Sequence, residues 1–303
     1  MGNPLQVLRD IIKNIKPVTI KELATFQGGL VGYVNYDLVR KWGYLPEISP
    51  EDTVMPEALF TASKRLIVFD HLTHKIKVIA FAHLRENDDL KEIYDLACEE
   101  VGETIAELQR PLSSMSEKAP FSLTDFESNF NRDDFNESVR KAKEHIMLVD
   151  LGRNDVGKVA MPGSVTVPRL MEVEHYSHVM HIVTRLEGLL KPQMDGFDLF
   201  MATFPAETVT GAPKIRAMEI ISELEPSSRG PYAGAVGYFG FNGNMDFCIT
   251  IRTISIVENR LSVQVGAGIV YDSSPEKEYE ETLKKAGAMF KAIERSKNDS
   301  DDR

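Results

Sequence analysis

The stretch from Phe204 to Glu219, FPAETVTGAPKIRAME, constrains the local fold of this chain more than any other. Gly211 lets the backbone turn, and Pro213 suits the first turn of a helix because its ring fixes φ near the helical value. Apolar residues then recur at helical spacing, so a helix is predicted to begin near Pro213. These residues are Ile215, Met218, Ile220 and Ile221. The amides at such a helix start can bind a carboxylate or phosphate, although an ordinary capped loop-to-helix junction has the same pattern.

Size and composition set the outer limits. The chain has 303 residues, of which 43% are hydrophobic and 27% charged, enough for a substantial core in one large or two medium domains. A net charge of −11 without a basic run argues against nucleic-acid binding. With no membrane-length apolar run and no signal-peptide pattern, we expect a cytoplasmic protein without a membrane partner. Cys98 and Cys248 are expected to be buried free thiols in a reducing compartment.

The pattern along the chain mixes helices and strands. Residues 3–16 and 89–108 have the apolar spacing of amphipathic helices. Residues 66–70 and 76–81 have the composition of strands on either side of a short loop. GGLVGYVNYDLV, from residue 28, alternates like a strand whose glycines bring backbones close together. The sequence therefore predicts an α/β chain.

Five further sequence blocks accompany this stretch, two before it and three after it. They are MLVDLGRNDVGKV (147–159), VEHYSHVMHIVTRLEG (173–188), RGPYAGAVGY (229–238), ITIRT (249–253) and VGAGIVYDSSPEKEYEETLKKA (265–286). Together these blocks closely resemble the chorismate-utilising domain of anthranilate synthase component I. The resemblance covers about half of the chain and is weaker upstream, where QGGLVGYVNYDLVRKW (27–42) is similar to the family's N-terminal domain.

The resemblance implies an α/β (α+β) fold, a large sheet-and-helix sandwich of the chorismate-utilising enzyme type. We expect a partial N-terminal domain at residues 1–110 and a partial chorismate-binding catalytic domain at 135–295. The segment 111–134, rich in Pro, Ser, Asp and Asn, is the expected linker, and 296–303 forms a polar tail.

Part of the family's interior is expected to be absent. The predicted helix from Phe135 to about His145 runs into the apolar MLVDL with no turn residue between them. In the family, a helix resembling NESVRKAKEHI and a second helix that leads into MLVDL are separated by a long section. Here the two helices are merged near residue 146, so on the order of a hundred residues are missing. The start of the N-terminal domain is also short compared with the family.

The resemblance implies Mg²⁺, which prefers hard oxygen ligands and retains several waters. Glu144 and Glu281 match the family's metal ligands, and Glu278 would act as an outer partner. Glu278 and Glu281 are three apart on a predicted helix and share one face, although without the resemblance this would be a solvated acidic surface. The family has a glutamate where this chain has Lys141, whose charge would repel Mg²⁺ and weaken the case for Glu144.

His181 and Thr208 match the family's catalytic residues. His181 corresponds to the active-site histidine, suited to proton transfer, and Thr208 to a threonine at the reacting ring. A helix through YSHVMHIV would place His178 and His181 on one face, and from pattern alone a lone histidine among apolar neighbours is more often a core group. Glu207 replaces a family glycine beside Thr208. It should weaken the binding of an anionic substrate, and add strain if φ there is positive.

Substrate binding is expected from the remaining blocks. Arg252, in the apolar strand ITIRT, is expected to be a buried charge that needs an anionic partner such as a carboxylate of chorismate. Gly266, Ala267 and Gly268 would let backbone amides approach the other carboxylate closely. Tyr232 corresponds to a family tyrosine that contacts substrate, or is a structural residue at a strand end.

The resemblance implies a lyase of tryptophan biosynthesis that converts chorismate and ammonia to anthranilate and pyruvate. Ammonia would come from glutamine through a partner amidotransferase subunit (component II), since this chain has no Cys-His-Glu amidotransferase pattern. Three alternatives remain open. They are aminodeoxychorismate synthase component I, the isochorismate and salicylate synthases, and a catalytically inactive chorismate-binding or assembly subunit. The N-terminal motif expected to carry tryptophan feedback falls in the part that is missing relative to the family, and a lysine-bearing motif that would separate the first alternative falls in the missing interior section.

Overall fold

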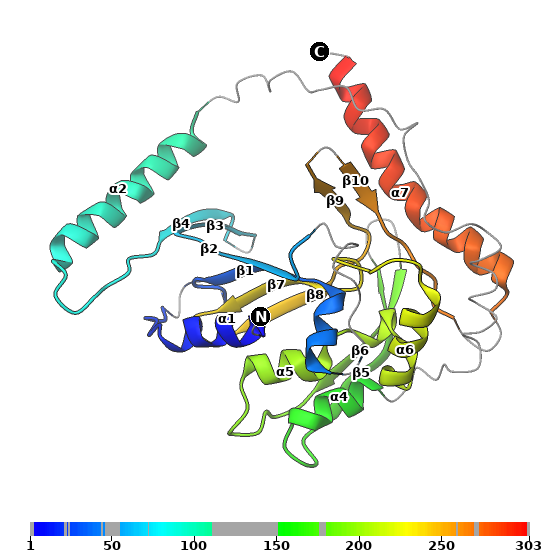
Figure 1. Ribbon diagram of the computed structural model, residues 1–303. Coiled ribbons are helices and arrows are strands. Elements are labelled where there is room, and N and C mark those ends of the chain that lie inside the picture. The colour runs from blue at the N-terminus through cyan, green and yellow to red at the C-terminus, as the bar shows by residue number, and fades with distance from the viewer. Residues whose placement is uncertain are drawn as a thin grey trace.

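The computed structural model describes residues 3–20, 23, 25–43, 45, 55–71, 73–110, 151–175, 180–258, 260–269 and 273–301. In these residues the chain has the predicted mixed α/β fold, built around a four-stranded antiparallel sheet (Figure 1). The strand order is β2-β1-β7-β8. Their bounds are Gly29–Val34 for β1, Ala58–Ala62 for β2, Ala235–Gly240 for β7 and Met245–Ile249 for β8.

This sheet joins distant parts of the sequence. Strand β1 pairs with β2 on one side and with β7 on the other, so that Val34 lies opposite both Ala58 and Ala235. The glycines of β1 allow this close pairing: a Cβ on Gly32 would lie 1.9 Å from the carbonyl oxygen of Leu59. The predicted division into an N-terminal and a catalytic part stays a prediction, but both parts contribute strands to one sheet.

Helix α1 (Pro4–Lys13) confirms the amphipathic helix predicted for residues 3–16. Asn3 caps it by accepting a hydrogen bond from the amide of Leu5 at 3.1 Å, and Pro4 occupies the first turn. Leu5 and Leu8 are buried in the core against the sheet. The apolar face of the helix thus explains both its formation and its position.

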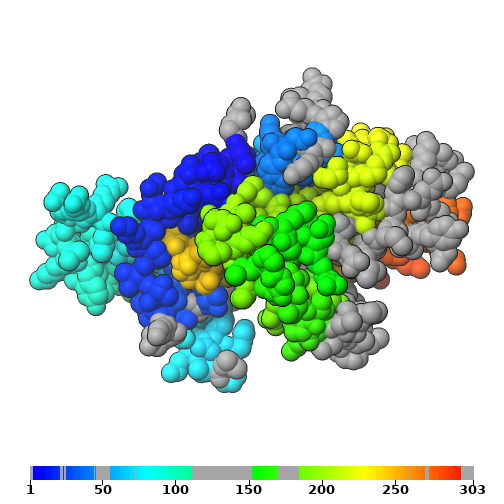
Figure 2. All heavy atoms as spheres, turned by 90° about the horizontal axis from the view of Figure 1, so that it is seen from below, coloured from blue at the N-terminus to red at the C-terminus, as the bar shows by residue number. Residues whose placement is uncertain are grey.

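Helix α5 (Gly196–Thr203) lies beside α1, and the two helices are seen together in the view from below (Figure 2). Asp195 and Asp198 form a capping box at its start. Arg9 of α1 binds both carboxylates, at 2.9 and 2.6 Å. Within the core, Phe197 of α5 stacks on Phe239 of β7 with 4.1 Å between ring centroids.

The strands and helix predicted between residues 66 and 108 are confirmed. Strands β3 (Arg65–Asp70) and β4 (Lys75–Ala80) form an antiparallel hairpin. Helix α2 (Leu90–Leu108) starts at Asp89, whose carboxylate accepts from the first-turn amides. Thr104 of α2 accepts a hydrogen bond from Arg65 Nη1 at 3.1 Å, which ties the helix to the hairpin.

The remaining elements surround the sheet. They are the 3₁₀ helices η1 (Tyr36–Trp42) and η4 (Glu207–Val209), helices α4 (Leu151–Val159), α6 (Lys214–Leu224) and α7 (Pro275–Asp301), and the two-stranded pairs β5 (Thr166–His175) with β6 (Met180–Glu187) and β9 (Ile254–Val257) with β10 (Arg260–Val263). Helix α7 extends to Asp301, so most of the predicted polar tail is helical.

Exposure corrects one expectation for the two cysteines. Cys98 and Cys248 are free, as predicted, but both are exposed, so the prediction that they are buried was wrong. Cys248 is one of the residues of β8 whose side chains face away from the core, because every second side chain of a strand does so. Of the helices in the described ranges, none combines the length and apolar character needed to cross a bilayer. The predicted linker and the helix at 135–145 lie outside the described residues.

Candidate active site

The loop that carries Thr208 connects α5 to α6. It forms the short helix η4, in which the amides of Thr210 and Gly211 donate to the carbonyl of Glu207 at 3.1 and 2.9 Å. Gly211 has φ +109°, a conformation that other residues rarely adopt. Helix α6 then begins at Lys214, as predicted. No side-chain cap bonds to the start of α6 at Pro213, so the anion cradle proposed for the first amides of this helix stays a prediction. Thr208 itself is exposed.

A buried group of charges lies under this loop. Lys214 Nζ at the start of α6 binds Asp155 of α4 and the carbonyl of Thr203, the latter at 3.3 Å. Asp155 also binds Lys158, at 2.8 Å. The side chains of Lys214 and Asp155 are 8% and 2% exposed. This ion pair fixes the start of α6 to α4 at a point where neither charge reaches water.

Glu207 faces the same group of charges. A Cβ on Gly152 of α4 would lie 3.7 Å from Glu207 Oε2. Burial and the neighbouring Asp155 carboxylate raise the pKa of Glu207 to about 7. Glu207 lies in η4 and is not among the residues with positive φ, so the backbone strain considered from the sequence does not arise. Its carboxyl group is therefore part of the contact between η4 and α4.

Lys285 links Gly266 to Glu281, and Tyr232 packs against the same glycine. A Cβ on Gly266 would lie 2.5 Å from the Tyr232 hydroxyl, so the tyrosine fills the space that glycine leaves. Lys285 Nζ on α7 donates to the Gly266 carbonyl at 3.1 Å and pairs with Glu281 at 2.7 Å. Burial raises the pKa of Tyr232, which keeps its hydroxyl a hydrogen-bond donor. Ala267 and Gly268 continue the same segment.

Arg229 connects this group to the Thr208 loop. Its Nη1 donates to the carbonyl of Val209 at 2.6 Å, and its guanidinium lies 5.6 Å from the centre of the Tyr232 ring. Glu225 accepts from Nε and Nη2 at distances of 2.6 to 3.1 Å. The sequence reasoning missed Arg229, because its partners Val209 and Tyr36 come from other segments. It also missed Lys285, although a glutamate four residues before a lysine on a helix predicts such a pair.

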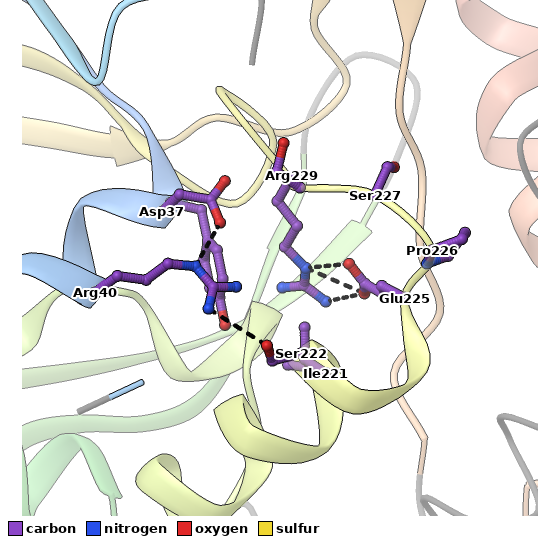
Figure 3. Close-up of a pocket in the computed structure, with 10 residues that line it drawn as sticks. Asp37, Arg40, Ile221, Ser222, Glu225, Pro226, Ser227 and Arg229 are labelled. Carbon is purple, nitrogen blue, oxygen red and sulfur yellow. Dashed lines mark hydrogen bonds and ion pairs between the residues drawn. The ribbon is translucent and has the colours of Figure 1, made fainter. Parts of the chain in front are cut away.

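A pocket of about 100 Å³ opens beside Arg229, between η1 and the end of α6 (Figure 3). Arg40 donates to Asp37 at 3.1 Å and to Ser222 at 3.3 Å on one side of it. Arg229 and Glu225 form the facing side (Figure 3). Two arginines and two carboxylates thus balance each other around the pocket.

Arg252 does not occupy a buried strand, so that prediction was wrong. It lies between β8 and β9, is exposed and has φ +51°. Beyond Ile249 the chain leaves the sheet, because the amide of Ile251 donates back to the Ile249 carbonyl at 2.9 Å in a tight turn. Its guanidinium is accessible to solvent and to an anion from solution.

His181 lies on strand β6, opposite Glu174 of β5, and not on a helix that it could share with His178. The apolar run around it pairs with β5 as a hairpin, which corrects the helical interpretation. Tyr176 and His178 lie outside the described residues, as do Glu144 and Lys141.

Of the three predicted metal ligands, the structure describes Glu278 and Glu281. Glu278 and Glu281 both lie on the first turns of α7, as the helix prediction requires. Across the described ranges, no group of three or more His, Cys, Asp or Glu side chains is placed to hold a metal ion. Two carboxylates on one helix face nevertheless have the oxygen chemistry of a Mg²⁺ site that takes its other ligands from water and substrate. The described carboxylates therefore have the donor chemistry for Mg²⁺, and Glu281 is paired with Lys285 in this structure.

Comparison with known proteins gives a consistent result. The chain matches the sequence model of the chorismate binding enzymes over residues 2–146 and 127–291. The two matches overlap at 127–146, the segment where two helices of the family are predicted to be merged. Anthranilate synthase component 1 of Acetivibrio thermocellus is 34% identical over 402 residues, covering 97% of this chain and 80% of the relative. At least 99 of those positions, the excess of 402 over the 303 residues present, have no counterpart here, which supports the missing section.

Other relatives agree. Anthranilate synthase component 1 of Synechocystis sp. is 34% identical over 414 residues, covering 96% of this chain and 81% of the relative. The crystal structure of anthranilate synthase component I from Streptococcus pneumoniae TIGR4 superposes with a TM-score of 0.81 at 30% identity. That superposition covers 95% of this chain and 85% of the crystallised one. The fold described above is therefore that of this solved structure over most of the chain.

Proposed function

Because this chain belongs to the chorismate binding enzyme family, we propose that it is the large subunit (component I) of an anthranilate synthase. In this proposal it is a Mg²⁺-dependent lyase of tryptophan biosynthesis. It converts chorismate and ammonia to anthranilate and pyruvate. The names of its relatives and the likeness to the Streptococcus pneumoniae structure support this assignment over the isochorismate synthases.

The observation that carries the proposal is the contact between Tyr232, Gly266 and the α7 residues Lys285 and Glu281. The resemblance assigns Tyr232 and Gly266 to the substrate and Glu281 to the metal, and the fold brings all three together from separate segments. A dianionic substrate suits a place where a tyrosine hydroxyl and a lysine converge on glycine-rich backbone.

Each remaining residue then has a role in the proposal. The amides of Gly266, Ala267 and Gly268 bind one carboxylate of chorismate, and Arg252 binds the other. Thr208 lies at the reacting ring, and His181 transfers a proton as the 4-hydroxyl group leaves. Ammonia adds to the ring as the 4-hydroxyl group leaves, and elimination of the enolpyruvyl group as pyruvate, with loss of a ring proton, then makes the ring aromatic.

Mg²⁺ would be held by Glu281 and Glu144, with Glu278 as an outer partner. When bound, it would orient the ring carboxylate and offset developing negative charge. Glu281 would have to exchange its ion pair with Lys285 for the metal, and a surface pair of this kind costs little to break. Ammonia would come from a glutamine amidotransferase subunit (component II).

A second candidate function is a chorismate-binding subunit that does not turn over its ligand. The missing positions in the alignment and the presence of Lys141 favour it.

Anthranilate fluorescence tests the first proposal. Purified chain is mixed with chorismate, Mg²⁺ and ammonium salt, without any partner subunit. We expect a fluorescent product that disappears with EDTA and in His181→Ala. Mg²⁺-dependent chorismate binding without product would support the second candidate. A non-fluorescent product that a lyase specific for aminodeoxychorismate converts to 4-aminobenzoate would favour aminodeoxychorismate synthase.

A further inference from the structure

Arg229 lies where four segments of the chain meet. Its side chain is 9% exposed and donates to Glu225 at the end of α6 and to the Val209 carbonyl in η4. The guanidinium also lies 4.8 Å from the centre of the Tyr36 ring and 5.6 Å from that of Tyr232. A buried cation with this number of partners is held in one place, and its partners are held with it.

We propose that Arg229 is a positioning residue that fixes η4, which carries Thr208, relative to Tyr232. The proposal rests on the proposed function, because it takes Thr208 and Tyr232 as substrate contacts. Arg229 itself reaches neither the substrate cradle nor the metal ligands. It acts through Val209, the residue after Thr208, and through the tyrosine ring.

The hydrogen bond from Arg229 to the Val209 carbonyl stabilises η4 through a residue outside this short helix. Inside η4, Thr210 and Gly211 donate to the Glu207 carbonyl, which forms a single short turn. Such a turn is marginal by itself, because it fixes several backbone angles for few hydrogen bonds. The Val209 carbonyl has a charged donor at 2.6 Å, and this bond keeps Thr208 in place.

The loop of Arg229 is in turn fixed by the N-terminal part of the chain. The amide of Gly230 donates to Asp37 Oδ2 at 2.9 Å, and the Tyr36 amide donates to the Gly230 carbonyl at 2.8 Å. The Tyr232 amide donates to the Arg229 carbonyl at 3.1 Å. Residues on η1 thereby hold the same loop that positions Tyr232.

Lysine cannot replace Arg229 in this place. The guanidinium uses separate nitrogens for Glu225 and for Val209 and presents a flat face to two rings. An ammonium group is a point charge on a longer flexible stem, so it can keep the charge while losing the fork and the stacking. Arg229→Lys therefore tests geometry and leaves the charge unchanged.

Arg9→Lys is the matched control. Arg9 is 16% exposed, pairs with Asp195 and Asp198, and lies 5.5 Å from the centre of the Phe197 ring, away from the Arg229 loop. For both variants, kcat and the KM for chorismate are measured per folded molecule with ammonium salt as the nitrogen source. We expect Arg229→Lys to lower kcat roughly 10- to 100-fold with a smaller change in KM, and Arg9→Lys to leave kcat within about threefold. Equal kcat losses in the two variants would overturn the proposal.

A second readout does not depend on turnover. Hydrogen exchange of the amides at 207–211 is compared among the unmodified protein, Arg229→Lys and Arg9→Lys. Faster exchange in Arg229→Lys alone supports the positioning role even where no anthranilate forms, so the proposed function and this inference can fail separately. Unchanged exchange overturns it. Should Arg229→Lys not fold, Glu225→Gln, which removes the charged partner of Arg229, is expected to give the same effects at smaller size.

Discussion

Lys214 of α6 and Asp155 of α4 form an ion pair that is almost completely buried, although 59 positions separate them in sequence. Removing one partner of such a pair leaves an unpaired charge out of water. We expect Lys214→Met to lower the free energy of unfolding by roughly 3 kcal/mol, since Lys158 still compensates part of the Asp155 charge. Urea unfolding measures the change.

Lys158→Met is the control, because the Lys158 side chain is 52% exposed, and this substitution should lower the free energy of unfolding by about 1 kcal/mol or less. Similar losses in both variants would contradict the assigned burial.

Glu207 makes stability depend on pH. Its pKa of about 7 in the folded protein lies above the ordinary value of 4.5, so the folded state holds a proton that the unfolded state has lost between these pH values. The contribution of Glu207 to the free energy of unfolding is therefore fully present below pH 4.5 and is lost as the pH rises through 7. Glu207→Gln should remove that loss. Between pH 5 and pH 8, the free energy of unfolding of Glu207→Gln should rise relative to that of the unmodified protein by on the order of 1 kcal/mol, after allowance for partial solvation. Urea unfolding at both pH values decides this. Glu280→Gln on the exposed part of α7 should show no such gain, and a pH-independent effect of Glu207→Gln would refute the assignment.

Gly266 and Gly268 should respond differently to the same substitution. A Cβ at 266 meets the Tyr232 hydroxyl at 2.5 Å, whereas a Cβ at 268 meets no protein atom within 4 Å. Because Arg229 restricts the tyrosine ring, Gly266→Ala should cost about 1 to 3 kcal/mol of stability. Gly268→Ala should leave stability unchanged and raise the KM for chorismate, since the space it fills is proposed for substrate. Thermal unfolding and steady-state kinetics separate these outcomes. Equal melting temperatures for the two variants would argue against the Tyr232–Gly266 contact.

Glu281 and Glu280 provide a test of the metal site. Glu281→Gln removes a proposed Mg²⁺ ligand while breaking an exposed ion pair with Lys285 that contributes little to stability. We expect the Mg²⁺ concentration for half-maximal activity to rise at least about tenfold, with little change in the melting temperature. Glu280→Gln, one residue away and exposed, should leave the Mg²⁺ requirement unchanged. If both variants behave like the unmodified chain, Glu281 is not a ligand.

Local patterns predicted much of the fold. Helices α1 and α2 and strands β3 and β4 follow from apolar spacing within each segment, and the start of α6 follows from Pro213 and the apolar residues after it. These elements depend on interactions between neighbours in sequence. The β6 strand around His181 shows the limit, because a short apolar run is compatible with either a helix or a strand until its partner strand is known.

The site was less predictable where it depends on distant contacts. Arg252 looked buried from its apolar neighbours, but the turn after Ile249 carries it out of the sheet. The contact of Tyr232 with Gly266 and the pairing of Lys214 with Asp155 join separate segments, and nothing in either local pattern identifies the partner. The family resemblance pointed to Tyr232 and Gly266, but the contact of Arg229 with Val209 and that of Lys285 with Gly266 became visible only in the fold.

The pairing of β1 with β7 also has a consequence for how the chain acquires its structure during synthesis. A ribosome releases residues 29–34 long before residues 235–240, so the first strand lacks one neighbour while about two hundred residues are still to be made. Contacts over such a distance close slowly, because the intervening chain must lose its freedom first. We therefore expect the N-terminal strand to spend this interval with an open edge that chaperones can bind, and the sheet to complete late.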